Sequence, residues 1–316
     1  MKFTVLVITY NASWEKLRLT LLSALKQDFD NYEIVIADDG SAHFPEDQVR
    51  DFMESKGFSD YTLVKNTTNQ GTVKNLLSGL EVCRGRYVKF ISAGDLFYSE
   101  KTIEMIYNFM SKNGSLCSFG LMQAYRYVDG KLQKEEFNHP FDIEAYRKKD
   151  YDRITKNLVL YSDNACGAAI TYEREFAIEY MKKLENRVRY MEDIFQPLAA
   201  VEEKHMDFLD DYVIWYELGE GVSTRKKSSF EGKMREDVDN FYRMLYQMYP
   251  DNLYVRKRYG LMGIYKIKNL YIRSICRLFV NPDAIRYLMN ARKQRKSGAH
   301  KTVGSQIGFL DRGDFE

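Results

Sequence analysis

The chain has 316 residues, of which 45% are hydrophobic and 29% charged, and this composition is ordinary for a soluble globular protein. No stretch approaches the roughly 18 uninterrupted apolar residues of a membrane-spanning helix. The apolar start, MKFTVLVITYN, is too short for a signal peptide. We therefore expect a cytoplasmic protein, and its four cysteines are too widely spaced for a metal or redox motif.

The formal net charge of +2 is unevenly distributed along the chain. Residues 251–301 contain 13 Lys and Arg against 2 Asp and Glu, whereas residues 1–250 contain 33 against 40. This asymmetry predicts an acidic body followed by a basic C-terminal region.

The first hundred residues alternate strand-like and helix-like segments. Continuous apolar, β-branched runs predict strands that are buried on both faces. These runs are 3–9, 32–37, 61–65 and 87–91. Helical spacing of apolar residues predicts helices after Ser13, over 72–83 and over 99–110. The alternation predicts an α/β fold with a mostly parallel central sheet, in which ligands bind at the carboxyl ends of the strands.

The pattern is less regular from residue 118 onward. Two strand-like runs flank Asp129-Gly130 and predict a hairpin. Further strands are expected over 168–172 and 212–218, with helices from Glu173 and from near Asp193. After about Phe230 the pattern is entirely helical, and it begins with an apolar seam. The seam is Met234, Val238, Phe241, Leu245 and Met248. We predict one domain over 1–228 and a basic helical region over 229–316.

Acidic residues follow two of the predicted strands. Asp38 and Asp39 end one strand, and adjacent carboxylates repel each other, so they need a ligand donor, a cation or a helix N-terminus nearby. A simple turn is an equally ordinary role for this segment. Another strand leads into Ser92-Ala93-Gly94-Asp95. The carboxylate of Asp95 could bind a divalent cation beside a diphosphate leaving group, or it could only cap a turn.

Two later segments also carry candidate functional groups. Glu192 and Asp193 precede an apolar helical run, where acids commonly complement the helix dipole, but a carboxylate that faces a pocket can act as a general base. The segment GEGVSTR places two glycines before Arg225, which could reach phosphate oxygens or could simply lie in a solvated basic loop.

Taken in order, these segments resemble the family-two glycosyltransferases. The resemblance rests on VLVITYN, EIVIADDGS, NTTNQGTVKN, YVKFISAGDLF, YMEDIF and GEGVSTR, and it covers roughly residues 1–225. It implies the GT-A nucleotide-diphospho-sugar transferase fold, followed here by a helical C-terminal appendage.

The resemblance also implies roles for single residues. Asp39 matches the acid that binds the base, typically uracil, and Asp193 of the Glu192-Asp193 pair matches the catalytic base. Asp95 matches the surviving ligand of the metal-binding acidic motif. The residues matched to the nucleotide-sugar site are Thr9, Tyr10, Asn11, Asp38, Asp39, Lys74, Asn75, Ala93, Gly94, Asp95 and Arg225.

The implied reaction is the inverting transfer of one sugar from a UDP-sugar to a hydroxyl of a glycan or lipid-linked acceptor. Such acceptors belong to surface polysaccharide, wall polymer or glycoprotein assembly. Asp193 would deprotonate the acceptor. Mn²⁺ or Mg²⁺ at Asp95, helped by Lys74 or Arg225, would neutralise the leaving diphosphate.

The sequence departs from the family pattern in two ways. Ser92 and Gly94 stand where the family's acidic motif usually has Asp, which weakens the expected metal site. A QxxRW-type motif is also absent, which argues against a processive polysaccharide synthase.

Other functions fit the sequence less well. A sugar nucleotidyltransferase or a Rossmann dehydrogenase would need a Gly-rich loop after the first strand, and residues 7–11 lack one. Nucleic-acid binding through the basic tail has no recognised motif, and the acidic body disfavours it. A catalytically inactive binding or scaffold subunit stays open as an alternative.

The basic C-terminal region interleaves apolar residues with Lys and Arg. A basic amphipathic helix pair of this kind can lie on an anionic membrane, here the inner face of the plasma membrane. It can equally pack on the catalytic domain or on a second copy of the chain as a homo-oligomer.

Overall fold

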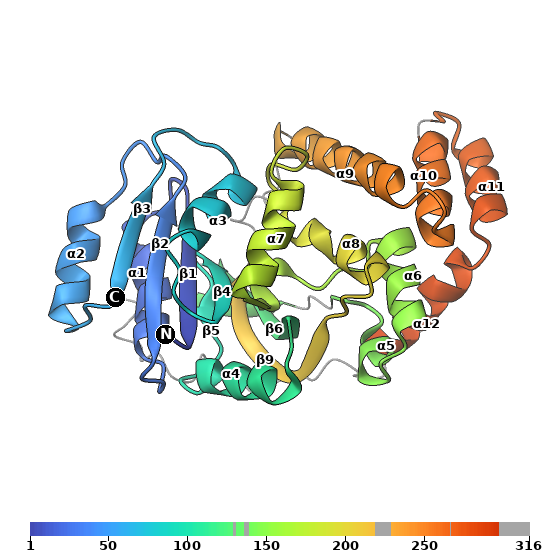
Figure 1. Cartoon of the computed structure of the whole chain (residues 1–316). Coiled ribbons are helices and arrows are strands. Elements are labelled where there is room, and N and C mark those ends of the chain that lie inside the picture. Colours follow the sequence, from blue (N-terminus) through green and yellow to red (C-terminus); the bar gives the residue numbers. More distant parts are fainter. Residues whose placement is uncertain (129–130, 136–138, 219–228, 266, 297–316) are drawn as a thin grey trace.

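The computed structural model describes residues 1–128, 131–135, 139–218, 229–265 and 267–296. Within them a nine-stranded sheet is flanked by helices (Figure 1). The strands are β1 (Phe3–Thr9), β2 (Tyr32–Asp38), β3 (Tyr61–Lys65), β4 (Tyr87–Ser92), β5 (Leu96–Phe97), β6 (Cys117–Val128), β7 (Lys131–Glu135), β8 (Ile170–Glu173) and β9 (Asp207–Glu217). The α-helices are α1 (Trp14–Leu25), α2 (Glu46–Ser55), α3 (Thr72–Leu80), α4 (Thr102–Asn113), α5 (Ile143–Arg147), α6 (Tyr151–Tyr161), α7 (Arg174–Leu184), α8 (Gln196–Val201), α9 (Ser229–Met248), α10 (Leu253–Tyr265), α11 (Leu270–Val280) and α12 (Ala284–Lys296). Two 3-10 helices, η1 (Gly167–Ala169) and η2 (Glu192–Phe195), lie between them.

The sheet is mixed: the pairs among β1 to β4 and the β6–β9 pair are parallel, as the alternation of elements predicted, and the other four described pairs are antiparallel. Its strand order is β3-β2-β1-β4-β8-β6-β9-β5, and β7 pairs with β6. Strands β1 to β4 run parallel to one another. β8 is antiparallel to both β4 and β6, so β6 and its parallel neighbour β9 run in the same direction as β1. The carboxyl ends of β1, β2 and β4 therefore share one edge of the sheet.

Alternating side chains of the central strands build a core on each face of the sheet. In β1, Leu6 packs into one cluster while Val5 and Val7 pack into the other, and all three are fully buried. Helices α1, α2 and α4 cover the second cluster, and α3 and α7 cover the first. The continuous apolar run of β1 follows from this burial on both sides.

The C-terminal helices extend the first of these clusters. Phe241 and Leu245 of α9 are fully buried among side chains of α7 and α8, as the apolar seam predicted. The seam ends earlier than predicted, because Met248 is 42% exposed. Figure 1 shows α9 leading to α10, α11 and α12 at the end of the molecule opposite α2. The predicted boundary at residue 228 lies outside the described residues and stays a prediction.

Several element boundaries differ from the sequence prediction for local reasons. Helix α4 begins at Thr102 rather than Ser99, because the Ser99 N–H donates to the Thr102 hydroxyl and forms a turn there. The chain after Asp193 begins as the 3-10 helix η2, and α8 starts only at Gln196 with Pro197 in its first turn. Strand β9 begins at Asp207, earlier than predicted, and meets β6 across two register shifts.

Membrane-spanning segments were not expected from the sequence. Among the helices of the described residues, none is both long enough and apolar enough to cross a bilayer.

Candidate active site

Three predicted site segments lie at the shared carboxyl edge of β1, β2 and β4. Thr9 pairs with Asp38 in the β1–β2 ladder, and Ile8 pairs with Ser92 in the β1–β4 ladder. The loops that leave these strands therefore start side by side. Burial of the strands fixes their register, and that register fixes where the polar residues emerge.

The loops after β1 and β2 are joined to each other by short hydrogen bonds. The Asn11 N–H donates to the Ser41 hydroxyl at 2.7 Å, and the Ala42 N–H donates to Asn11 Oδ1 at 3.3 Å. Asp38 accepts from the backbone N–H and the hydroxyl of Ser41 and is buried. Asp38 thus stabilises the loop, while Tyr10 beside it is 48% exposed and available to a ligand.

Asp39 joins β2 to the start of α3. Its Oδ1 accepts from the Gln70 N–H and its Oδ2 from the Gly71 N–H, both at 2.8 Å, and the side chain is 4% exposed. The segments approach so closely that a Cβ on Gly40, whose φ is +71°, would lie 2.6 Å from the Thr68 carbonyl carbon. Each carboxylate oxygen keeps a second lone pair, so a role in base binding stays a prediction alongside this structural one.

Asn75 and Lys74 occupy the first turns of α3 with different surroundings. Asn75 is buried, and its amide donates to the Ala37 carbonyl at 3.0 Å and accepts from Asn66. It therefore fixes α3 against the end of β2. Lys74 is partly exposed on the same helix. The structure thus places Lys74, rather than Asn75, where a ligand could contact it.

Arg189 connects the loop before α3 to the segment that leads into η2. Its guanidinium donates to the carbonyl and side-chain oxygens of Asn69 at 2.9 and 3.0 Å, and its carbonyl accepts from the Val73 N–H at 3.2 Å. A Cβ on Gly71, whose φ is +93°, would lie 2.3 Å from Arg189 Cγ. Only glycine at position 71 leaves room for this contact.

Asp237 of α9 holds the same segment from the other side. Its carboxylate accepts from the backbone N–H groups of Arg189, Tyr190 and Met191 at 2.9, 2.7 and 3.3 Å, and the residue is 5% exposed. These three donors immediately precede Glu192 and Asp193. The helical C-terminal region therefore contributes directly to the position of the predicted catalytic pair.

Glu192 and Asp193 lie against the turn at Gly167. A Cβ on Gly167 would lie 2.7 Å from Glu192 Oε1 and 3.6 Å from Asp193 Oδ2. The Asp193 carbonyl accepts from the Gln196 amide at 3.0 Å, and the same amide pairs with both backbone groups of Ala165. Burial, and then repulsion from Asp193, raises the pKa of Glu192. Burial likewise raises the pKa of Asp193, while a backbone hydrogen bond from Gly167 partly opposes the shift. Asp193 is thus a carboxylate tuned toward accepting a proton.

The side chain of Asp95, the one acid in the loop Ser92–Asp95 at the end of β4, points into the protein. Asp95 is 4% exposed, and its Oδ1 accepts from the Glu217 N–H at 3.0 Å. Burial raises the pKa of Asp95 to about 7. The Thr20 hydroxyl on α1 donates to the Asp95 carbonyl at 2.8 Å and accepts from the Gly94 N–H at 2.9 Å, so the loop is fixed to α1.

Lys89 lies beneath this loop and was not singled out from the sequence. It is fully buried in β4, and its ammonium donates to the carbonyl oxygen of Ala168 at 2.6 Å. Burial lowers the pKa of Lys89 to about 7, although the nearby carboxylate of Asp95 raises it. The sequence does carry a signal for Lys89, which is a lysine inside an otherwise apolar strand. A buried charge needs partners, so such a residue points to polar groups nearby.

The short segment Gly167-Ala168 lies between the acids. Lys89, which is close to Asp95, donates to the carbonyl of Ala168. The neighbouring Gly167 lies against Glu192 and Asp193. The acid after β4 and the Glu192-Asp193 pair therefore approach the same segment of the chain. The structure brings together the residues that the sequence predicted at Asp95, Glu192 and Asp193.

The expected Mn²⁺ or Mg²⁺ at Asp95 does not fit the donors at this edge. Ser92 and Gly94 offer no carboxylate, and Asp95 is turned toward backbone partners. Within the described ranges, no group of three His, Cys, Asp or Glu is arranged to hold a metal ion. Hard cations need several oxygen ligands around one point. The predicted contribution of Arg225 lies outside the described residues, as does the rest of its loop.

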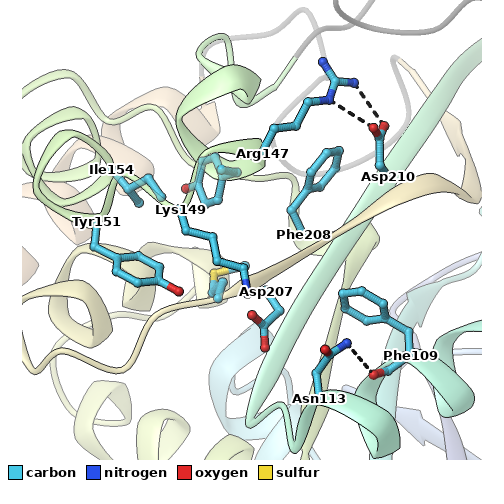
Figure 2. Close-up of a pocket in the computed structure, with 11 residues that line it drawn as sticks. Phe109, Asn113, Arg147, Lys149, Tyr151, Ile154, Asp207, Phe208 and Asp210 are labelled. Carbon is cyan, nitrogen blue, oxygen red and sulfur yellow. Dashed lines mark hydrogen bonds and ion pairs between the residues drawn. The ribbon is translucent and has the colours of Figure 1, made fainter.

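A surface hollow with a volume of about 290 Å³ lies elsewhere (Figure 2). It is lined by the end of α4, by α5 and α6, and by the first residues of β9. Arg147 and Asp210 face each other across its rim, with an Nη2–Oδ1 distance of 3.0 Å. Because β9 runs parallel to β1, this hollow is at the amino edge of the sheet, opposite the predicted site. We do not assign it to the donor.

Known proteins resemble this chain at the level of family, sequence and fold. A family model described as Glycosyl transferase family 2 matches residues 4–180. The chain is 24% identical over 283 residues to WcaA of Escherichia coli (strain K12), which is named as a colanic acid biosynthesis glycosyl transferase, and the match covers 85% of this chain and 90% of WcaA.

A second relative matches a shorter stretch. The chain is 24% identical over 154 residues to WfgD of Escherichia coli, named as a UDP-Glc:alpha-D-GlcNAc-diphosphoundecaprenol beta-1,3-glucosyltransferase. The match covers 49% of this chain and 55% of WfgD.

Among solved structures, S. aureus TarS 1-349 in complex with UDP-GlcNAc is similar, with a TM-score of 0.55 and 16% identity over 94% of this chain and 92% of that one. This likeness shows a shared fold, and it confirms the expected GT-A architecture with C-terminal helices.

The hydrogen bonds of Asp237 lead to a stability prediction. Replacing Asp237 by Ala leaves three backbone N–H groups without their acceptor. We expect the free energy of unfolding, measured by urea denaturation, to fall by roughly 2–4 kcal/mol. The exposed neighbour Glu236→Ala serves as the control and should change it by less than about 0.5 kcal/mol. Equal effects of the two substitutions would contradict the anchoring role of Asp237.

Proposed function

Because the chain belongs to glycosyl transferase family 2, we propose that it transfers one sugar from a UDP-sugar to a hydroxyl of a glycan acceptor, with inversion at the anomeric carbon and Asp193 as the general base. Membership of the family makes the chain a glycosyltransferase. The observation that carries the finer proposal is the placement of Asp193. Its pKa is raised by burial, its carbonyl accepts from Gln196, and the segment just before it is held by Asp237.

The base assignment follows from the requirements of an inverting transfer. The acceptor hydroxyl must lose its proton as it attacks the face opposite the leaving nucleotide, and a carboxylate with a raised pKa accepts that proton more readily. Burial raises the pKa of both carboxyls, and the negative charge of Asp193 raises that of Glu192 further, so the pair favours a state that carries a single negative charge. We assign the proton acceptor to Asp193 and a supporting role to Glu192.

The donor assignment draws on the loops after β1, β2 and before α3. Tyr10 is exposed beside the buried Asp39, and Lys74 is partly exposed on the first turn of α3. An aromatic ring can stack on a base, and a lysine can contact phosphate oxygens. TarS, which shares the fold, was solved with UDP and with UDP-GlcNAc, and WfgD is named for UDP-Glc. These names support uridine diphosphate as the nucleotide.

The acceptor class draws on the relatives and on the C-terminal helices. WcaA is named for colanic acid biosynthesis and WfgD for a diphosphoundecaprenol-linked acceptor. We extend this to a surface glycan, built on a lipid carrier, as the acceptor of this chain. A lipid-linked acceptor would be reached from the membrane surface.

Helices α11 and α12 present apolar side chains suited to such a surface. Tyr271, Ile275 and Phe279 recur every four residues along α11 and are 84%, 68% and 89% exposed. Leu288 and Met289 of α12 are also more than half exposed. Exposed basic residues adjoin them, namely Lys268, Arg286, Arg292 and Lys293. An apolar face flanked by cations is complementary to an anionic lipid surface, so we propose peripheral contact with the inner face of the membrane.

Nucleotide binding tests the proposed donor class. UDP should raise the apparent melting temperature of the full chain more than GDP, CMP or NAD does, because a ligand that binds only the folded state stabilises it. Thermal shift measures the effect, and calorimetry confirms it. A chain that no uridine nucleotide stabilises would instead favour the inactive scaffold subunit.

Removing the base should separate chemistry from binding. Asp193→Asn should lower the rate of transfer by about 10²–10⁴-fold and leave UDP affinity within about twofold of wild type. In the wild type, activity should fall as the pH drops and Asp193 gains a proton, at a pH above the ordinary carboxyl pKa of about 4. Transfer kinetics with Asp47→Asn, an exposed aspartate of α2, provide the control. Full activity of Asp193→Asn would refute the base assignment.

Membrane contact has its own measurement. The full chain should sediment with vesicles that contain phosphatidylglycerol and much less with phosphatidylcholine alone. The double substitution Ile275→Asp/Phe279→Asp should lower binding roughly tenfold. Val82→Asp, at an exposed apolar position after α3, should not. Loss of a dimer in light scattering, with unchanged vesicle binding, would assign the face to a second copy instead.

A further inference from the structure

The loop after β4 has Gly94 where the family's acidic motif usually has Asp, and the structure shows which group lies in the space of the missing side chain. Gly94 has a φ of +109°, and a Cβ placed there would lie 2.3 Å from Glu217 Oε2. The carboxylate of Glu217 therefore fills the space that a side chain at position 94 would need. With the Glu217 carboxylate in this position no side chain fits at position 94, and the positive φ of Gly94 disfavours one there in any case.

The carboxylate of Glu217 forms an ion pair with an ammonium group of the same chain. Lys16 Nζ on the first turn of α1 lies 2.8 Å from Oε1 and 2.9 Å from Oε2 of Glu217. The carboxylate side chain is 10% exposed, whereas that of Lys16 is 32% exposed. An ion pair shielded to this extent on the carboxylate side is held firmly, because its geometry satisfies both oxygens. Lys16 is therefore the more exposed side chain of the pair.

The surroundings keep the pair and the loop in fixed positions. The Glu217 N–H donates to Asp95 Oδ1 at 3.0 Å, and the Tyr125 hydroxyl donates to the Gly94 carbonyl at 2.5 Å. Thr20 bonds to both Gly94 and Asp95 from α1, one helical turn beyond Lys16. The ammonium group is thus built into the same edge of the sheet as the loop that follows β4.

We propose that Lys16 supplies the positive charge for the leaving diphosphate, so that this transferase binds UDP and releases it without a divalent cation. The proposal rests on the proposed function, since it concerns the same donor site. Lys16 belongs to the helix that begins just after the loop Thr9–Asn11, and the N-terminal turn of that helix adds a partial positive charge. Glu217 acts as a positioning residue that holds the lysine head group.

The charge balance of the reaction explains the need for this group. The bond between the anomeric carbon and the β-phosphate oxygen breaks, and its electron pair stays on that oxygen. The acceptor oxygen forms the new bond to the anomeric carbon, and its proton passes to Asp193. The released UDP then carries one more negative charge than the diphosphate of the donor. A fixed ammonium group stabilises charge that develops in this way, because it needs no reorganisation during the reaction.

The test compares UDP and uridine on the purified full chain, by calorimetry, in EDTA and in Mn²⁺. We expect the affinity of the wild type for UDP to be the same within about twofold in both solutions. Lys16→Met should weaken UDP binding by roughly tenfold or more and leave uridine binding unchanged, because the lost contact is a charge-assisted one to phosphate. Lys182→Met, at an exposed lysine of α7, is the matched control.

A second variant guards against a folding defect. Lys16→Met leaves the shielded Glu217 carboxylate without its partner, which is destabilising by itself. The double variant Lys16→Met/Glu217→Gln removes both charges and should show the same selective loss of UDP affinity with a restored melting temperature.

The outcomes distinguish this inference from the proposed function. UDP binding that requires Mn²⁺ in the wild type, or that survives in both Lys16 variants, would overturn the role of Lys16 alone. If neither UDP nor uridine bound the wild type in any solution, the proposed donor class would fail, and this inference with it.

Discussion

The carboxylate of Asp39 is the junction on which the site depends. By accepting from the backbone of Gln70 and Gly71, it fixes the start of α3 to the end of β2. Gly71 in turn leaves room for Arg189, which bonds to Asn69 and continues into the segment held by Asp237. One continuous set of hydrogen bonds therefore runs from the sheet edge to the residues just before Asp193. The carboxylates of Asp39 and Asp237 are buried, so the loss of their donors would leave buried charges unsatisfied, and that penalty keeps the loops in one arrangement.

These hydrogen bonds include α9, the first of the C-terminal helices, in the same packed unit as the sheet. Sequence composition separates them from the body by charge, and a boundary near residue 228 follows naturally from that change. In the structure, Phe241 and Leu245 complete the core beside α7 and α8, while Asp237 reaches the catalytic segment. The first C-terminal helix, α9, therefore helps to position the residue that we propose as the base. The exposed apolar side chains are instead concentrated on α11 and α12, farther along the chain.

The sequence predicted the sheet well, because burial on both faces leaves a strong local signal. The run Phe3–Thr9 matched β1 at both ends, and the runs 32–37, 61–65 and 87–91 matched β2, β3 and β4 to within one residue. Helices α2, α5 and α6 were not predicted; α2 buries only Val49 and Met53, and most of its other residues are charged. Motif order singled out the acids Asp39, Asp95 and Asp193, and their roles stay predictions. The ion pair of Lys16 with Glu217 was not predicted, because the two residues are 201 positions apart and only the folded chain brings them together.

The contact between Gly94 and Glu217 also constrains how this chain can change over time. An aspartate introduced at position 94 would collide with the Glu217 carboxylate, and a smaller residue at 217 would leave Lys16 without its holder. The positive φ of Gly94 is a second obstacle, because a side chain at that position is strained whatever residue stands at 217. An acid at position 94 would therefore need a different backbone conformation of the loop as well as a shifted Glu217 carboxylate, so one substitution alone does not restore an acidic side chain to this point of the site.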